Sequence, residues 1–171
     1  MRSECVVLLA FLLAPLADAQ IVVEPNPGTV TYLDWRYGFR DLKFEQPIET
    51  CKGMVLVEDD GHQKFYTRKD ENLEFEGAKL KLVEYGFYKG KLANVTINAE
   101  GKTNSVALLK ALEKDYGAGL PSPRTHDKLY WFGQRVLADY MASDGGEKCS
   151  CGMWSKPMQA LRDAGGVLNP Q

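Results

Sequence analysis

Two cysteines stand one residue apart in the stretch KCSCGMW, residues 148–154. If this stretch is a β-strand, residues i and i+2 point to the same face, so the thiols of Cys149 and Cys151 are neighbours. Outside the first 19 residues, Cys51 is the only other cysteine. Three thiols in an oxidising compartment can form a disulfide, exchange with other thiols or bind a metal ion.

A structural disulfide between Cys51 and either Cys149 or Cys151 is the simplest interpretation, and it leaves one thiol free. Closing a loop of about 100 residues stabilises a fold by a few kcal/mol in the chain-entropy model. A second possibility is a disulfide between Cys149 and Cys151 themselves. Its small ring would be strained and exchangeable, which would allow a redox role with Cys51 as the resolving thiol. Free thiols without a role are also compatible with the pattern.

Metal binding is a further possibility, because the sequence has two histidines, His62 and His126. Three cysteines and one histidine could bind zinc, and Met153 or Met141 could complete a soft copper(I) site. Zinc sites more often use Cys-x-x-Cys spacing, so we expect no metal and no cofactor. Cys51 with His62 or His126 could form a nucleophile and base pair. The sequence has no Gly-x-Ser-x-Gly, Walker or His-Glu-x-x-His motif, so we expect a non-enzymatic protein.

The N-terminus has the pattern of a secretory signal peptide over residues 1–19. Arg2 precedes an apolar run from residue 6 to 13, and Ala17 and Ala19 place small residues at the −3 and −1 positions of a cleavage site. We therefore expect a periplasmic or extracellular protein, with an extended lead-in at 20–31 and a single domain at 32–171. No later apolar run reaches the roughly 18 residues of a membrane span, so we expect no transmembrane segment in the mature chain.

Charge limits the classes of partner. Removing residues 1–19 takes one basic and two acidic residues from totals of 21 and 23, which leaves a net charge of −1. Binding to nucleic acid requires a basic stripe that displaces counterions, and no such stripe is present. We therefore expect no nucleic-acid partner and no polybasic contact with a membrane surface.

The elements that position these residues are predicted mainly as hairpins. Leu33, Trp35, Tyr37 and Phe39 recur at every second position, which predicts a strand. Residues 47–53 predict a short helix that carries Cys51 near its end. Residues 54–68 form one hairpin around an Asp-Asp-Gly turn, and residues 80–98 form another around Lys-Gly.

The second half predicts a helix, two strands and a final helix. Apolar residues at helical spacing predict a helix at 103–117, with cap hydroxyls between Thr103 and Ser105 and Gly117 at its end. Strands at 128–143 and 147–155 follow, and a short helix starts at Pro157. The fold class is therefore α+β, an antiparallel sheet of hairpins with one central amphipathic helix and a short C-terminal helix packed on it.

Several segments of the chain resemble a family of small uncharacterised bacterial exported proteins. The segments are GFRDLKFEQPIE, FYTRKDENL, VEYGFYKGKL and ALEKDYG followed by YWFG, between residues 38 and 133. The resemblance implies an envelope setting and an order of strand, short helix, two hairpins, helix and strand pair. It implies no catalytic residue and does not include the two neighbouring cysteines.

Together these features favour an exported module that binds a protein or another component of the cell envelope. The exposed face of the sheet is the expected binding surface, with Tyr88 and Trp131 as candidate residues. The alternative is a thiol-redox or metal-handling protein that uses Cys149 and Cys151.

Overall fold

Alternating apolar and polar residues build the sheet that dominates the computed structural model, which describes residues 23–167. In β7 (Lys91–Glu100), Val95, Ile97 and Ala99 are buried while the residues between them face the other side. This period of two is the pattern of a strand with one face in the core. The described part of the chain is mixed α and β with mainly strands, and all the strand pairs are antiparallel, as expected.

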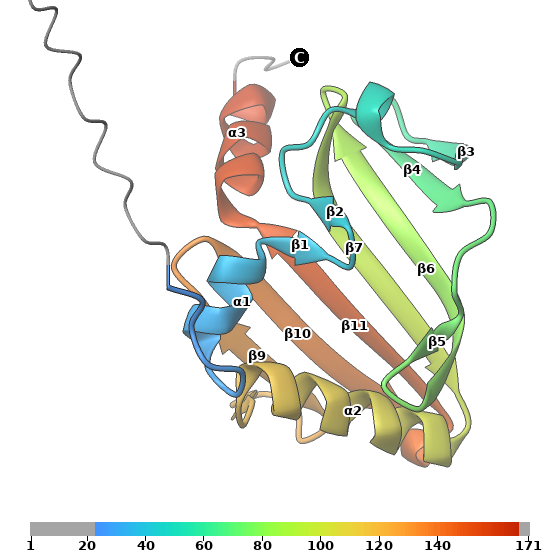
Figure 1. The fold of residues 1–171 in the computed structure, drawn as a ribbon, viewed down its shortest axis with the longest axis vertical. Coiled ribbons are helices and arrows are strands. Elements are labelled where there is room, and N and C mark those ends of the chain that lie inside the picture. Colours follow the sequence, from blue (N-terminus) through green and yellow to red (C-terminus); the bar gives the residue numbers. More distant parts are fainter. Residues whose placement is uncertain (1–22, 168–171) are drawn as a thin grey trace, which may run out of the picture.

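The main sheet has nine strands, and its order is β3-β4-β6-β7-β11-β10-β9-β8, with β5 paired to β6 (Figure 1). Its other strands are β3 (Met54–Asp59), β4 (Gln63–Arg68), β5 (Glu74–Phe75), β6 (Ala78–Tyr88), β8 (Leu120–Pro121), β9 (Lys128–Phe132), β10 (Val136–Ser143) and β11 (Lys148–Ser155). The hairpins β3–β4 and β6–β7 lie where the sequence predicts them. The strand expected over 128–143 is two strands, β9 and β10, which pair with each other.

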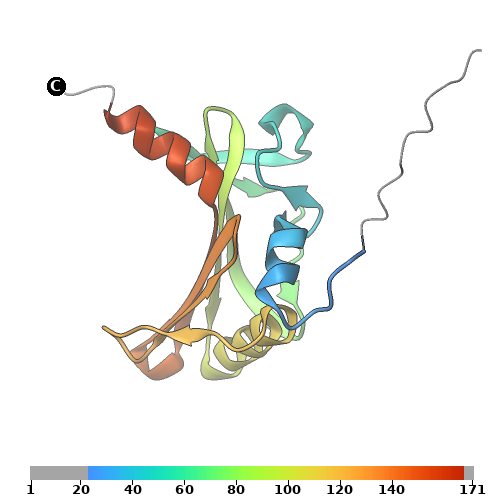
Figure 2. The same cartoon turned by 90° about the vertical axis from the view of Figure 1, so that its left-hand side faces the viewer.

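One face of the sheet is covered by helices. α2 (Lys102–Tyr116) places Leu108, Leu112 and Tyr116 in the core. α1 (Val30–Arg36) and the small hairpin of β1 (Gly38–Phe39) and β2 (Leu42–Lys43) lie on the same side (Figure 2). The short 3₁₀ helix η1 (Ile48–Thr50) and η2 (Asp144–Gly146) fill two connections. α3 (Lys156–Val167) leaves the end of β11 toward the other side, where Met158 packs against Tyr88.

The strand predicted around Leu33 is wrong, because this segment is the helix α1. Leu33 and Tyr37 are buried, and they are four residues apart, so the spacing of the apolar residues also fits a helix. Thr29 caps the N-terminus by accepting a hydrogen bond from the Tyr32 amide at 3.2 Å. Tyr37 ends the helix in a left-handed conformation with φ of 41°. Leu33 and Tyr37 fit the spacing of a strand and of a helix, and the cap at Thr29 therefore decides in favour of the helix.

A carboxylate on α1 holds the turn between β9 and β10. Asp34 accepts backbone hydrogen bonds from Gln134, from Arg135 at 2.8 Å and from Val136 at 2.9 Å. A β-carbon at Gly133 would lie 2.3 Å from Asp34 Oδ1, so only glycine allows this close approach. The contact joins segments about 100 residues apart and fixes α1 against the sheet.

A partly buried ion pair fixes the opposite half of the sheet. Arg40, which follows β1, pairs with Glu71 and donates a further hydrogen bond to the Glu74 carbonyl at 3.0 Å. The hydroxyl of Tyr85 on β6 donates to the second oxygen of Glu71 at 2.6 Å. The Glu71 side chain is only 8% exposed, so its charge depends on these partners.

The expected signal peptide at 1–19 lies outside the described residues. The described part of the expected lead-in, residues 23–29, contains no helix or strand, but the next residues already belong to α1. Among the residues that the structure describes, no helix is long and apolar enough to cross a membrane.

Candidate functional site

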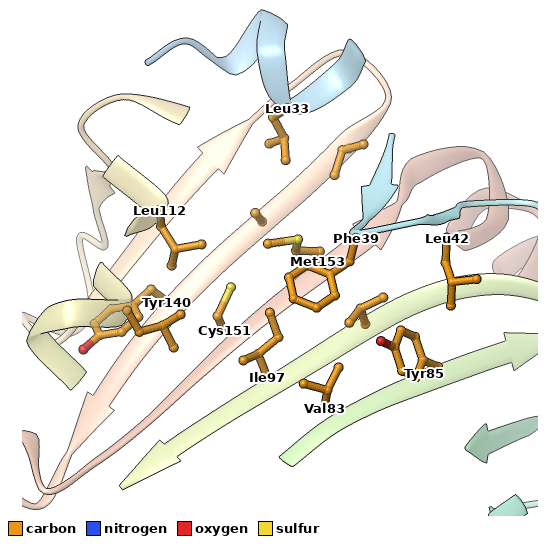
Figure 3. Packing of buried hydrophobic residues seen from close by; sticks show 14 of the residues in the cluster. Leu33, Phe39, Leu42, Val83, Tyr85, Ile97, Leu112, Tyr140, Cys151 and Met153 are labelled. Carbon is orange, nitrogen blue, oxygen red and sulfur yellow. The ribbon is translucent and has the colours of Figure 1, made fainter. Parts of the chain in front are cut away.

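The two neighbouring cysteines lie on β11 and point to the same face, as expected, but that face is the core. Cys149 is 5% exposed and Cys151 is fully buried. In Figure 3, Cys151 points into the packed core near Ile97 and Met153. Cys51 lies at the end of η1, and its thiol donates to the Pro47 carbonyl at 3.4 Å.

All three of the cysteines described are free thiols, so the structure contains neither the disulfide to Cys51 nor a bond between Cys149 and Cys151. Burial raises the pKa of Cys151 and of Cys51 above that of an exposed thiol. The thiolate is the reactive form in exchange and the ligand form in metal binding, so burial opposes both. These side chains act as small apolar groups in the core.

The histidines do not approach these thiols. His62 lies in the β3–β4 turn, where its amide donates to Asp60 at 2.8 Å, and His126 lies in the loop before β9. Within residues 23–167, no group of three or more histidine, cysteine or acidic side chains is placed to hold a metal ion. The weak metal set of Cys51, Cys149, Cys151 and the two histidines is therefore not brought together.

Tyr88 and Trp131, which were expected on a binding surface, are both buried. Trp131 is 1% exposed, and its indole nitrogen donates to the Gly117 carbonyl at 2.7 Å. Tyr88 is 7% exposed because Met158 of α3 covers it together with Ala93. Both predictions are wrong because each aromatic ring packs beneath a helix or its terminus, which the strand pattern alone does not reveal.

The described residues do form a cavity of about 340 Å³ between α2 and the strands β9 and β10, here named the α2 cavity. Its walls are mainly apolar. They are formed by Lys102, Ser105, Val106, Leu109, His126, Asp127, Leu129, Tyr140, Ala142, Gly145 and Gly146. Binding pockets for small molecules typically combine such apolar walls with a few polar groups.

Backbone hydrogen bonds fix the rim of the α2 cavity. The Gly101 amide donates to the Glu147 carbonyl at 2.7 Å, which holds the start of α2 next to η2. The Ala142 amide donates to the Asp127 carbonyl at 2.9 Å, which holds the loop before β9 against β10. The cavity is therefore bounded by segments from two separate parts of the chain.

Ser105 contributes to the wall of this cavity, but its hydroxyl oxygen is not accessible from the cavity. Among the described residues, this oxygen is the one buried polar side-chain atom for which the hydrogen-bond geometry gives no partner. The residue is 2% exposed and its Oγ has no partner. Its carbonyl accepts a hydrogen bond from the Tyr140 hydroxyl at 3.0 Å. Burial, followed by the nearby Cys149 thiol, raises the pKa of Tyr140, which remains a neutral donor at pH 7; the adjacent Ser105 side chain acts in the opposite direction, so the two hydroxyls are neighbours.

The sequence pattern predicts Ser105 as one of the possible cap residues of α2. In the structure the residue before α2 is Gly101, and no side chain caps this helix. Ser105 lies one turn inside the helix and faces the sheet. The sequence contains no signal that distinguishes Ser105 from a serine on the surface of a helix. The burial of its hydroxyl depends on β10 and η2, which come later in the chain.

Ser105, His126 and Asp127 contribute to the same cavity, which is the composition of a hydrolase triad. A triad requires the nucleophile and the base to be within hydrogen-bond reach. In this structure the Ser105 hydroxyl makes no hydrogen bond to His126, so the three residues do not form the bonded chain of a triad.

No protein-family model, curated protein or solved structure matches this chain. The resemblance to bacterial exported proteins therefore stays a prediction, and the function has to be argued from the cavity itself.

Proposed function

We propose that this chain is an exported, non-enzymatic binding module that holds a small amphipathic component of the cell envelope in the α2 cavity. Export rests on the sequence pattern of residues 1–19. The observation that carries the binding role is the α2 cavity itself, whose mainly apolar walls carry a few polar groups, among them Lys102, His126 and Asp127. This is the usual composition of a site for a small amphipathic molecule.

The size of the cavity suits a small ligand. Its volume of about 340 Å³ lies at the lower end of the range of small-molecule sites, and the cavity is partly open to solvent. Leu109, Leu129 and Ala142 supply apolar contacts for its body. The thiol-redox and metal-handling alternatives find less support, because Cys149 and Cys151 are buried away from solvent.

The test uses 1-octanol as a neutral amphipathic probe of suitable size. The purified exported protein is titrated with 1-octanol and followed by amide chemical shifts in nuclear magnetic resonance. We expect saturable shifts at Ser105, Val106 and Ala142. Ala142→Phe fills the cavity and should abolish the shifts. Met141 points to the opposite face of the sheet, so the control variant Met141→Phe should leave the shifts unchanged.

Two results would count against the proposal. Shifts spread over surfaces remote from the α2 cavity would show nonspecific adsorption of the probe. Hydrolysis of p-nitrophenyl octanoate that disappears in Ser105→Ala would show that the cavity is an active site and that the protein is an enzyme.

A further inference from the structure

β3 is the outermost strand at one end of the main sheet, where it pairs with β4 alone (Figure 1). The backbone groups of an edge strand that face away from the sheet are available to pair with another chain. The Gly53 carbonyl, just before β3, accepts a hydrogen bond from the Lys69 amide at 2.8 Å and therefore faces β4. Backbone groups alternate in direction along an antiparallel strand, so those of Met54 and Leu56 face away from β4.

The side chains of this edge are apolar and accessible to solvent. Val55, Leu56 and Val57 follow one another along β3, and each is about half exposed. An exposed apolar edge strand is a site at which another strand can pair. A bulge between Leu56 and Glu58 interrupts the ladder with β4. The bulge limits regular pairing to the part of β3 up to Leu56.

Charges at the two ends of this edge favour a second copy of the same chain as the partner. Lys52, in the turn before β3, and Glu58, after the bulge, are both exposed. Neither makes an ion pair within residues 23–167. Burial, followed by the charge of Glu58, raises the pKa of Glu84, so a cation near these carboxylates would be favourable. In an antiparallel pair of two copies, the start of one strand lies beside the end of the other.

We propose that two copies of this chain pair through β3 about a two-fold axis perpendicular to the sheet, which joins their sheets into one antiparallel sheet. The register centred on Val55 places Met54 of each copy opposite Leu56 of the other, and each such pair exchanges two hydrogen bonds. The same register brings Lys52 near Glu58 of the second copy. The two-fold axis makes every such contact occur twice. This interface is independent of the α2 cavity, which lies at β9 and β10.

The association should be weak and reversible. Pairing of two short strands buries less surface than the roughly 1,200 Å² of stable complexes. Sedimentation velocity of the purified exported protein, from micromolar to millimolar concentration, should show a monomer–dimer equilibrium. Amide hydrogen exchange locates the interface. The amides of Met54 and Leu56 should exchange more slowly as the dimer forms, and the Val55 amide, which faces β4, should change much less.

Two variants disrupt the pairing at exposed positions. Val55→Lys places two lysines opposite each other at the two-fold axis and should weaken the dimer by about tenfold or more. Leu56→Pro removes an amide that faces away from β4, which an edge strand tolerates, and should weaken the dimer by about tenfold. Leu161→Lys is the matched control, because Leu161 is half exposed on α3, and it should leave the dimer unchanged.

An exchange of charges tests the register. Lys52→Glu and Glu58→Lys should each weaken the dimer by about threefold, and the double variant should restore most of the loss. A protein that stays monomeric at millimolar concentration would overturn the proposal, and so would a dimer that Val55→Lys leaves unchanged. A dimer that Val55→Lys disrupts but that the charge exchange does not restore would overturn the register. None of these results bears on the α2 cavity, so the proposed function is tested separately.

Discussion

Replacing Ser105 by alanine should stabilise the free protein, which is an unusual result for a buried polar residue. Burying a hydroxyl without a partner costs about 1–3 kcal/mol in proteins, and the Ser105 hydroxyl is in that state. Alanine also has a higher helix propensity than serine, by up to about 0.5 kcal/mol. The removed oxygen is inaccessible to solvent, so its loss leaves a space of about one atom that offsets part of this gain.

We expect the free energy of unfolding to rise by about 1–2 kcal/mol after allowing for lost packing. For a chain of this length that corresponds to a rise in melting temperature of about 2–8 °C. The assay is thermal and urea unfolding of the ligand-free exported protein, followed by circular dichroism. Any bound ligand must be removed first, because a bound ligand stabilises the wild type by mass action.

Ser155 provides the matched control, because it is a buried serine with hydrogen bonds. Its Oγ lies 3.0 Å from the Tyr37 hydroxyl and accepts from the Met158 amide at 3.2 Å, at the start of α3. Ser155→Ala should therefore destabilise the protein by about 1–3 kcal/mol. A loss of stability in Ser105→Ala of similar size would show that the Ser105 hydroxyl is bonded in the folded protein, with the adjacent Tyr140 hydroxyl as the partner, and would refute this prediction.

Three further predictions test the contacts that hold the sheet and its cover together. Glu71→Gln should lower the free energy of unfolding by about 2–4 kcal/mol, because it leaves the charge of Arg40 unpaired in a largely buried position. Urea unfolding measures this change, and a loss below about 1 kcal/mol would contradict the prediction. Asp34→Ala removes three backbone hydrogen bonds and should lower the free energy of unfolding by about 2–4 kcal/mol. Amide hydrogen exchange should increase first in the β9–β10 turn, and unchanged exchange there would refute the role of Asp34 in holding this turn. Asp41→Asn should cost at most about 1 kcal/mol at pH 7, because the pair with Arg68 is partly exposed. The hydrogen bond to Arg68 lowers the pKa of Asp41 in the folded protein. The stability that this pair contributes is therefore complete above the unfolded pKa near 3.9, and it is lost as pH falls through the lower folded pKa. A difference in stability between wild type and Asp41→Asn that persists at pH 2 would contradict this origin.

Local patterns account for what the sequence predicts correctly. The turns of β3–β4 and β6–β7 and the helix α2 are specified by residues within one element or one hairpin. The strand expected around Leu33 fails because Leu33 and Tyr37 satisfy a period of two and a period of four equally well. Only the cap at Thr29 distinguishes these, and it lies at the edge of the pattern.

Long-range contacts account for what the sequence leaves open. β7 pairs with β11, which lies some fifty residues later in the chain, and this pairing places Cys151 opposite Ile97 in the core. The spacing of Cys149 and Cys151 correctly predicts that they share a face but not which face. In the same way, Tyr88 and Trp131 are candidates for a surface until α3 and the end of α2 are placed over them.

Ser105 differs from the other polar residues of the core. Among the described residues, four polar or charged residues are buried: Gln63, Asn94, Ser105 and Ser155. The side chains of Gln63 and Asn94 bond to each other, and Ser155 bonds to Tyr37 and caps α3. The Ser105 hydroxyl is inaccessible to solvent, and the polar group beside it is the Tyr140 hydroxyl, which donates to the Ser105 carbonyl at 3.0 Å. The sign of the stability change in Ser105→Ala therefore decides whether this hydroxyl is an unpaired group that lowers stability or a bonded one that contributes to it.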